Sequence, residues 1–214
     1  MDKLNIAILP VTSFQQNCTF IWNDNDNHGV VIDPGGDFER IKEAIDQSGI
    51  LVDQILLTHG HLDHVGAAMK LKEYLDVEII GPHEDDKFLC DSVAETASKY
   101  GIGEGFDNVY PDQWLNEGDT VTIGGAKFDV YHCPGHAPGH VIFYNEERNF
   151  AHVGDVLFRG SVGRTDLPGG DHETLIASIK NKLFPLGDDV NFICGHGPGG
   201  NIGEERRTNP FLQG

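Results

Sequence analysis

The sequence predicts an α/β fold in a single domain spanning residues 1–214. Short β-branched, apolar segments alternate along the chain with amphipathic helical segments, which is typical of helices packed on sheets. A length of 214 residues fits one domain, and a hydrophobic content of 39% is enough to fill its core. The chain contains no repeat of fixed period and no linker that would divide it.

The first part of the chain is predicted to form short strands, followed by alternating helices and strands. The predicted strands are Leu4–Leu9, Cys18–Trp22, Val30–Asp33, Ile55–Leu57 and Val77–Ile80. Residues 23–27 are predicted to form a polar turn. Asp37 is the predicted N-cap of a helix that ends at Gly49, and a second helix should end near Leu75.

Residues 84–118 have a different character. A charged helix over Glu84–Lys99 leads into the glycine-bearing stretch 101–105, which can be a lid or substrate wall, or only a connection. Asp171 is expected to cap a final helix that buries Leu175, Ile176, Ile179 and Leu183. The strands predicted in this half are Thr120–Ile123, Lys127–His132, Val141–Tyr144, Phe150–Gly154 and Val190–Cys194.

Composition limits the possible partners. The formal net charge of −19 repels polyphosphate, and the 15 Lys and Arg form no cluster, so nucleic acid is excluded as a partner. No stretch of ~20 apolar residues and no signal peptide are present, so neither membrane association nor secretion is expected. The four cysteines are scattered without a framework, which indicates a reducing compartment and predicts a cytoplasmic location.

The segment Thr58–His64 carries the strongest chemical signal. It places three histidines and one aspartate, His59, His61, Asp63 and His64, directly after an apolar run. A strand leading into a loop would direct His59 and His61 to the same side. Imidazole nitrogen and carboxylate oxygen suit divalent ions such as Zn²⁺, so the segment predicts a metal site.

Three further candidate ligands follow other predicted strands: His136, Asp155 and His196. Each lies beside Gly or Pro, which let the backbone turn sharply near an ion. Cys133 and Cys194 can also be ligands, but such thiols are more often small buried groups. Five histidines and two aspartates suit two ions rather than one.

This pattern resembles the metallo-β-lactamase superfamily, in which T-H-x-H-x-D-H is followed by His, Asp and His. Within the superfamily the chain resembles glyoxalase II, or hydroxyacylglutathione hydrolase, in its short bacterial form. The segments that carry this resemblance are 10–12, 16–18, 33–36, 114–119, 132–136, 163–166 and 209–212.

The resemblance implies an αββα sandwich with the metals at one edge between two sheets. It assigns the first ion to His59, His61 and His136, and the second to Asp63, His64 and His196, with Asp155 bridging. The β-lactamases commonly have Cys at the Asp155 position, so the carboxylate favours the other hydrolases. His132 and His140 are left open as partners of the ligands or as structural histidines.

Two ions that share an oxygen lower the pKa of bridging water to about 7, which provides hydroxide for attack on a carbonyl. A thioester suits this site because its thiol leaving group needs little acid assistance. Asp63 can orient the hydroxide. The resemblance implies that the substrate is S-lactoylglutathione, an intermediate in methylglyoxal detoxification, and that the products are glutathione and D-lactate.

Substrate recognition is less determined by the sequence. Arg164, Arg206 and Arg207 are candidate partners for substrate carboxylates, or are solvated or structurally paired arginines. Zn²⁺ is the expected metal, although Fe and Mn also suit such ligands. Persulfide dioxygenases also resemble the chain, including the segment 163–166, and hold one iron on two His and one carboxylate, which would here be His59, His136 and Asp155. There are three alternatives to the thioester hydrolase: a persulfide dioxygenase, another hydrolase of the superfamily, and a non-catalytic interaction module stabilised by metal. The oligomeric state is left open.

Overall fold

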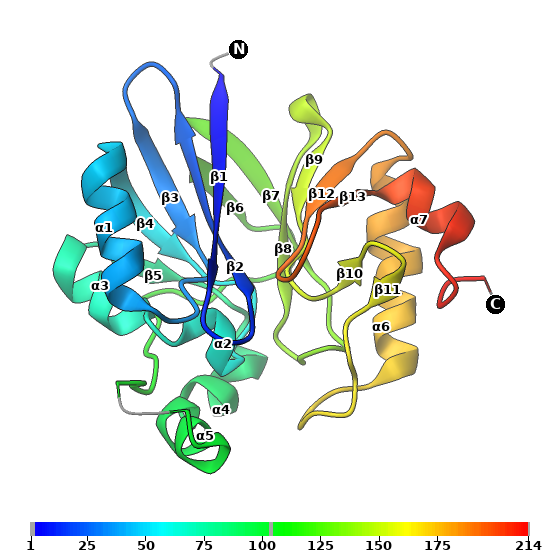
Figure 1. The fold of residues 1–214 in the computed structure, drawn as a ribbon. Helices are drawn as coiled ribbons and strands as arrows, with labels where there is room; N and C mark the ends of the chain where they lie inside the picture. The colour runs from blue at the N-terminus through cyan, green and yellow to red at the C-terminus, as the bar shows by residue number, and fades with distance from the viewer. Residues whose placement is uncertain (1–2, 103–104, 214) are drawn as a thin grey trace.

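The structure is a computed structural model in which residues 3–102 and 105–213 are described. It has four layers in the order helix, sheet, sheet, helix (Figure 1). The first sheet has the order β1-β2-β3-β4-β5, and the second has the order β13-β12-β9-β8-β7-β6. The predicted αββα sandwich is confirmed.

Most strand bounds agree with the predicted ranges to within two residues, but the strand before the histidine motif begins four residues earlier than predicted, and the short strands at 157–158, 161–162 and 200–201 were not predicted. The first sheet consists of β1 Leu4–Val11, β2 Gln16–Asn23, β3 His28–Ile32, β4 Leu51–Leu56 and β5 Glu78–Ile80. The second consists of β6 Thr120–Ile123, β7 Ala126–His132, β8 Val141–Asn145, β9 Phe150–His152, β12 Asn191–Ile193 and β13 Gly200–Asn201. A hairpin of β10 Leu157–Phe158 and β11 Ser161–Val162 lies outside both sheets.

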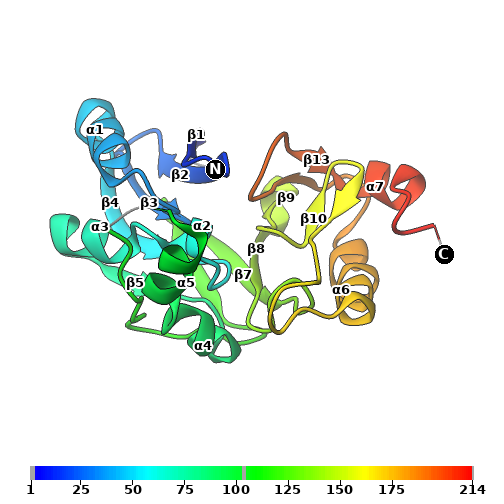
Figure 2. The same ribbon diagram turned by 60° about the horizontal axis from the view of Figure 1, so that its bottom comes forward.

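Helices cover the outer face of each sheet. The α-helices are α1 Phe38–Ser48, α2 Leu62–Val65, α3 Ala68–Leu75, α4 Lys87–Cys90, α5 Val93–Tyr100, α6 His172–Ser178 and α7 Ile202–Thr208. Figure 2 shows α1 and α3 on one outer side of the molecule and α6 and α7 on the other. None of the described helices is long and apolar enough to cross a membrane.

Successive residues of the central strands contact two different cores. Val31 packs beneath α1 and α3, whereas Val30 and Ile32 pack between the two sheets. Likewise, Ile55 packs beneath the helices, and Leu56 packs between the two sheets. Because strand side chains alternate between faces, a strand with a core on each side must be apolar at every position. This geometry explains the continuous apolar runs that precede Asp33 and the histidine motif.

Several helix predictions require correction. Asp37 is the N-cap residue of α1 as predicted, but its side chain does not cap the helix; its Oδ2 accepts hydrogen bonds from the Thr12 amide at 2.8 Å and from Arg40 at 2.9 Å. The predicted helix after the histidine motif is interrupted between α2 and α3. A Cβ at Gly66 would lie 2.4 Å from Phe106 and 2.6 Å from the Gly35 oxygen, so these neighbours pack directly on the backbone.

The second half also differs in detail. The predicted helix over residues 84–99 is divided into the 3₁₀ turn η1 (Glu84–Asp86), α4 and α5. The lid prediction over 101–105 includes residues 103 and 104, which lie outside the described residues. Asp171 caps α6 as predicted, accepting the Thr174 amide at 2.7 Å, but the helix continues as a π-turn over Ile179–Leu183. Helix α7 was not predicted.

Candidate metal centre

The seven predicted ligands follow the ends of four strands; five lie in loops, while Asp63 and His64 lie in the short helix α2. His59, His61, Asp63 and His64 follow β4, while His136, Asp155 and His196 follow β7, β9 and β12. Strands β7 and β8 are antiparallel, β8 and β9 are antiparallel, and β9 and β12 are parallel. Therefore β7, β9 and β12 run in the same direction, and their carboxyl ends meet at one edge of the second sheet.

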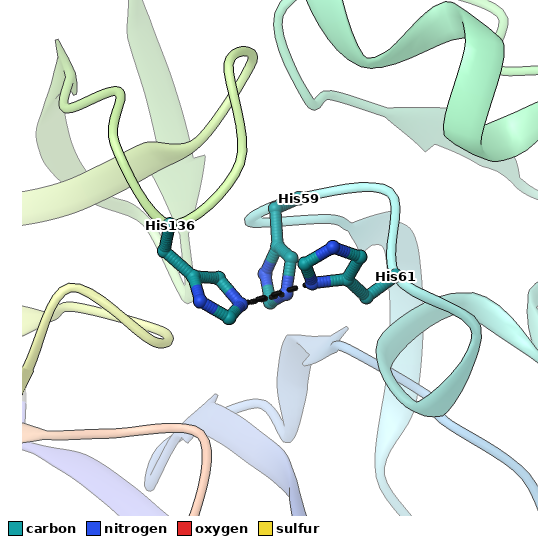
Figure 3. Close-up of side chains that lie close together, drawn as sticks. All are labelled: His59, His61 and His136. Carbon is teal, nitrogen blue, oxygen red and sulfur yellow. Dashed lines mark hydrogen bonds between the residues drawn. The ribbon is translucent and has the colours of Figure 1, made fainter. Parts of the chain in front are cut away.

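The first group of ligands is formed by His59, His61 and His136. Figure 3 shows their rings directed toward one another, with His136 reaching across from a separate loop. The His136 Nε2 atom is 2.9 Å from His61 Nδ1 and 3.2 Å from His59 Nε2. Nitrogens bound to one tetrahedral Zn²⁺ at ~2.05 Å would be separated by roughly 3.3 Å. The spacing of this group therefore fits one ion.

The second group is formed by Asp63, His64 and His196. The Asp63 Oδ2 atom is 3.3 Å from His196 Nε2 and 3.9 Å from His64 Nε2. Asp155 lies between the groups: its Oδ2 is 3.6 Å from His136 Nε2 and 3.5 Å from His196 Nε2. One carboxylate thus adjoins both ligand groups.

Hydrogen bonds on the outer nitrogens orient the imidazoles. The Nδ1 atoms of His136 and His196 donate to the carbonyl oxygens of Arg164 at 2.8 Å and Phe14 at 3.1 Å. His64 Nδ1 donates to Asp33 Oδ2 at 2.9 Å. In the neutral rings this leaves each Nε2 as a lone pair directed into the site, which is the tautomer that metal ligation requires.

Unsatisfied atoms and pKa shifts also fit metal binding. His64 Nε2 and Asp155 Oδ1 are buried without a hydrogen-bond partner, although they are 3.4 Å apart. Burial and the neighbouring His136 lower the pKa of His61 to about 3, and burial lowers the pKa of His59 and His136. These rings are therefore neutral at pH 7. Burial opposes ionisation of Asp155, but pairing with His64 outweighs it and holds the pKa of the carboxyl well below its usual range. Although burial alone would lower the pKa of His64, Asp155 and Asp63 raise it, so in the metal-free protein His64 is charged, and binding of an ion would displace its proton.

Two residues that were not assigned as ligands contact the ligands directly. Asp33, which has a φ of 53°, accepts hydrogen bonds from His64 and from the Thr58 amide and hydroxyl. His140 Nε2 accepts the Asp155 amide at 3.0 Å, and its ring stacks on His59. The sequence did offer a signal for the role of Asp33, because an acidic residue directly follows the apolar run of β3. Of the two alternatives left open for His140, contact with the ligands is the one observed.

The three predicted substrate arginines occupy different environments. Arg164 adjoins His136 through its backbone, and its exposed side chain pairs with Asp166 at 2.7 Å. Arg206 pairs with Asp188 at 3.2 Å and packs on the Phe184 ring, and Arg207 also approaches Asp188. Only Arg164 has a described contact with a predicted metal ligand.

A further cluster of possible ligands lies apart from the seven predicted ones. His83, Asp85 and His132 have donor atoms close together, and the two rings stack with centroids 4.2 Å apart and planes inclined by 14°. Near-parallel stacked rings direct their in-plane lone pairs side by side instead of toward a common point. His132 Nε2 also donates to the Pro138 oxygen at 2.7 Å. We therefore assign this cluster a structural role.

Residues 11–196 match the model of the metallo-β-lactamase superfamily, so the chain belongs to this superfamily. It is 51% identical to the hydroxyacylglutathione hydrolase GloC of Haemophilus influenzae over 98% of both chains. It is 36% identical to the probable metallo-hydrolase YqgX of Bacillus subtilis over 96% of both chains. These matches confirm the predicted class, a metal-dependent hydrolase similar to the hydroxyacylglutathione hydrolases.

Two solved structures share the fold and substantial sequence identity. The B3 metallo-β-lactamase BLEG-1 superposes with a TM-score of 0.89 at 37% identity, covering 98% of this chain and 100% of its own. TTHA1623 in a di-iron-bound form superposes with a TM-score of 0.86 at 39% identity, covering 96% of this chain and 100% of its own. The fold and the His/Asp groups together indicate a dinuclear site for divalent metal.

Proposed function

We propose that this protein is a dinuclear metallohydrolase that cleaves an acyl-glutathione thioester, S-lactoylglutathione, into glutathione and D-lactate. The position of Asp155 is the observation that carries the proposal. Its Oδ2 atom is within 3.6 Å of one histidine from each ligand group, as a carboxylate shared by two ions would be. His59, His61 and His136 would hold one ion, and Asp63, His64 and His196 the other.

When bound, two such ions lower the pKa of water to about 7 and polarise a substrate carbonyl. The side chains of the protein orient the attacking water and the metal ligands. Asp63 exposes 19% of its side chain beside the buried ligands, so its carboxylate can orient the attacking water by accepting a hydrogen bond. His140 fixes Asp155 through its amide, and Asp33 fixes His64. The departing thiol has a pKa of about 8.5 and requires little protonation.

The choice of substrate rests on the relative that shares 51% of the sequence and is named a hydroxyacylglutathione hydrolase. Arg164, which is exposed beside His136, is the proposed partner for a substrate carboxylate. The paired positions of Arg206 and Arg207 favour a structural role for both. Zn²⁺ as the metal, a cytoplasmic location and a role in methylglyoxal detoxification belong to the same proposal.

The proposal is tested by comparing three substrates on zinc-loaded and iron-loaded protein. S-lactoylglutathione, glutathione persulfide and a chromogenic β-lactam are supplied separately, with oxygen uptake followed in each case. We expect the zinc form to cleave the thioester without consuming oxygen and to prefer it over the β-lactam. Oxygen uptake on the persulfide, with no thioester cleavage by either metal form, would identify a dioxygenase. Preferential β-lactam hydrolysis would also refute the proposal.

A further inference from the structure

Asp86 is a fully buried carboxylate at the end of the turn η1. The ion pairs described for residues 3–102 and 105–213 do not include it, and its side-chain oxygens accept only backbone amides. Burial raises the pKa of Asp86 to about 7, while these amides favour the ionised form. A buried carboxylate without a cation is costly, so the hydrogen bonds that the two amides donate to Asp86 must offset that cost.

The two oxygens of Asp86 bind different parts of the chain. Oδ2 accepts the Gly60 amide at 2.8 Å, and Oδ1 accepts the Gly139 amide at 2.5 Å. Gly60 follows the first sheet, and Gly139 lies between β7 and β8 of the second sheet. A single side chain therefore joins loops that belong to the two halves of the sandwich.

Both glycines approach Asp86 closely. A Cβ at Gly139 would lie 2.5 Å from the Asp86 amide nitrogen and 2.7 Å from Asp86 Cβ. A Cβ at Gly60 would lie 3.1 Å from the Asp86 oxygen and 2.9 Å from Leu89 Cβ. The absence of side chains lets both loops pack directly on η1 and α4, so a change at Asp86 is transmitted to their backbones.

These loops carry the whole first ligand group. Gly60 separates His59 from His61, and Gly139 lies in the loop that contains His136. That loop is closed by a hydrogen bond from the Cys133 amide to the His140 oxygen at 2.7 Å. The spacing of the three imidazoles therefore depends on how the two loops are held against each other.

We propose that Asp86 is a positioning residue of the metal centre, whose two oxygens fix the loop of His59 and His61 against the loop of His136. The inference rests on the metal centre proposed above and is independent of the substrate. It assigns a role to the segment after β5, whose first turn holds the metal-binding loops together. Groups that orient ligands without binding the metal commonly affect metal affinity by about 10- to 100-fold.

The test is the isosteric substitution Asp86→Asn in the full chain. An amide has one acceptor oxygen, so its NH₂ group would face either the Gly60 or the Gly139 amide and could not bind it. We expect the folded, metal-free variant to bind Zn²⁺ about 10- to 100-fold more weakly, measured by competition with a chromophoric chelator. The visible spectrum of the Co²⁺-loaded variant should also change, because the loops that carry its ligands shift.

Asp85→Asn is the matched control, since this neighbouring carboxylate is 57% exposed and pairs with His83 at 3.3 Å. It should keep the wild-type affinity and spectrum. If Asp86→Asn does not fold, Asp86→Ala, which leaves room for water, is measured in the same way. Wild-type affinity and spectrum in the folded variant would overturn the inference, and so would failure of both variants to fold. If the wild type binds no Zn²⁺, the metal centre itself is refuted.

Discussion

Gly195 provides a sensitive test of the metal-centre geometry. A Cβ at this position would lie 2.0 Å from Asp155 Oδ1 and 2.6 Å from His64 Cε1. Real Cβ contacts are essentially never shorter than 3.0 Å, so in Gly195→Ala the carboxylate oxygen must move by about 1 Å. The backbone cannot easily retreat, because the Gly195 amide binds the Gly154 oxygen and its own oxygen accepts the Asn17 amide.

A displacement of about 1 Å in a catalytic group costs about 100-fold in rate, or roughly 2.7 kcal/mol of transition-state stabilisation. Overpacking should also lower the free energy of unfolding by about 1–3 kcal/mol. Turnover of S-lactoylglutathione, metal content and urea denaturation would be measured on the same preparations. We therefore expect turnover to fall about 100-fold or more in protein that remains folded.

Gly197→Ala is the matched control in the same loop. Its Cβ would meet no atom within 4 Å, while its φ of 69° imposes strain of about 1–2 kcal/mol. This variant should lose stability and keep its turnover within a few-fold of the wild type. Turnover of Gly195→Ala within threefold of the wild type, at full metal content, would refute the placement of Asp155 and His64 in the catalytic centre.

Four further predictions concern metal content, the bridge, substrate binding and pH. Reconstituted, desalted protein should contain two ions per chain by elemental analysis, and a fixed value of one would contradict a bridging Asp155. Asp155→Ala should reduce turnover of the metal-loaded protein by at least about 100-fold while changing its melting temperature little; near-normal turnover would show that Asp155 is not a ligand. Arg164→Ala should raise KM several-fold with little change in kcat, whereas an equal effect of Arg206→Ala would point to a different glutathione site. Burial lowers the pKa of His152 to about 4, so between pH 6.5 and 4 the unfolded state binds more protons and stability falls as pH falls. The variant His152→Asn lacks this group, so its free energy of unfolding should fall less steeply with pH over this range than that of the wild type. The difference in slope should be up to about 1.4 kcal/mol per pH unit, measured by urea titration of the metal-free proteins.

Local sequence was sufficient for most of the strands and for naming four of the candidate ligands. The runs that end at Ile32 and Leu57 are apolar at every position because the strands separate two cores, and this pattern can be read from consecutive residues. His59, His61, Asp63 and His64 lie within six consecutive residues that form a loop and the start of α2, so their chemistry was evident from their spacing. Helix ends were less predictable, since the interruption at Gly66 depends on Phe106, forty residues away.

The sequence by itself determined the class of protein and the chemical types of the ligands. Tertiary structure decided how His136, Asp155 and His196 meet the motif, which residues hold the ligands, and that Arg206 pairs with Asp188. The physical reason is the range of the interactions. Backbone periodicity and turn chemistry depend on residues a few positions apart, whereas the contacts of Asp155 depend on parallel strands and on the packing of two sheets formed by distant segments.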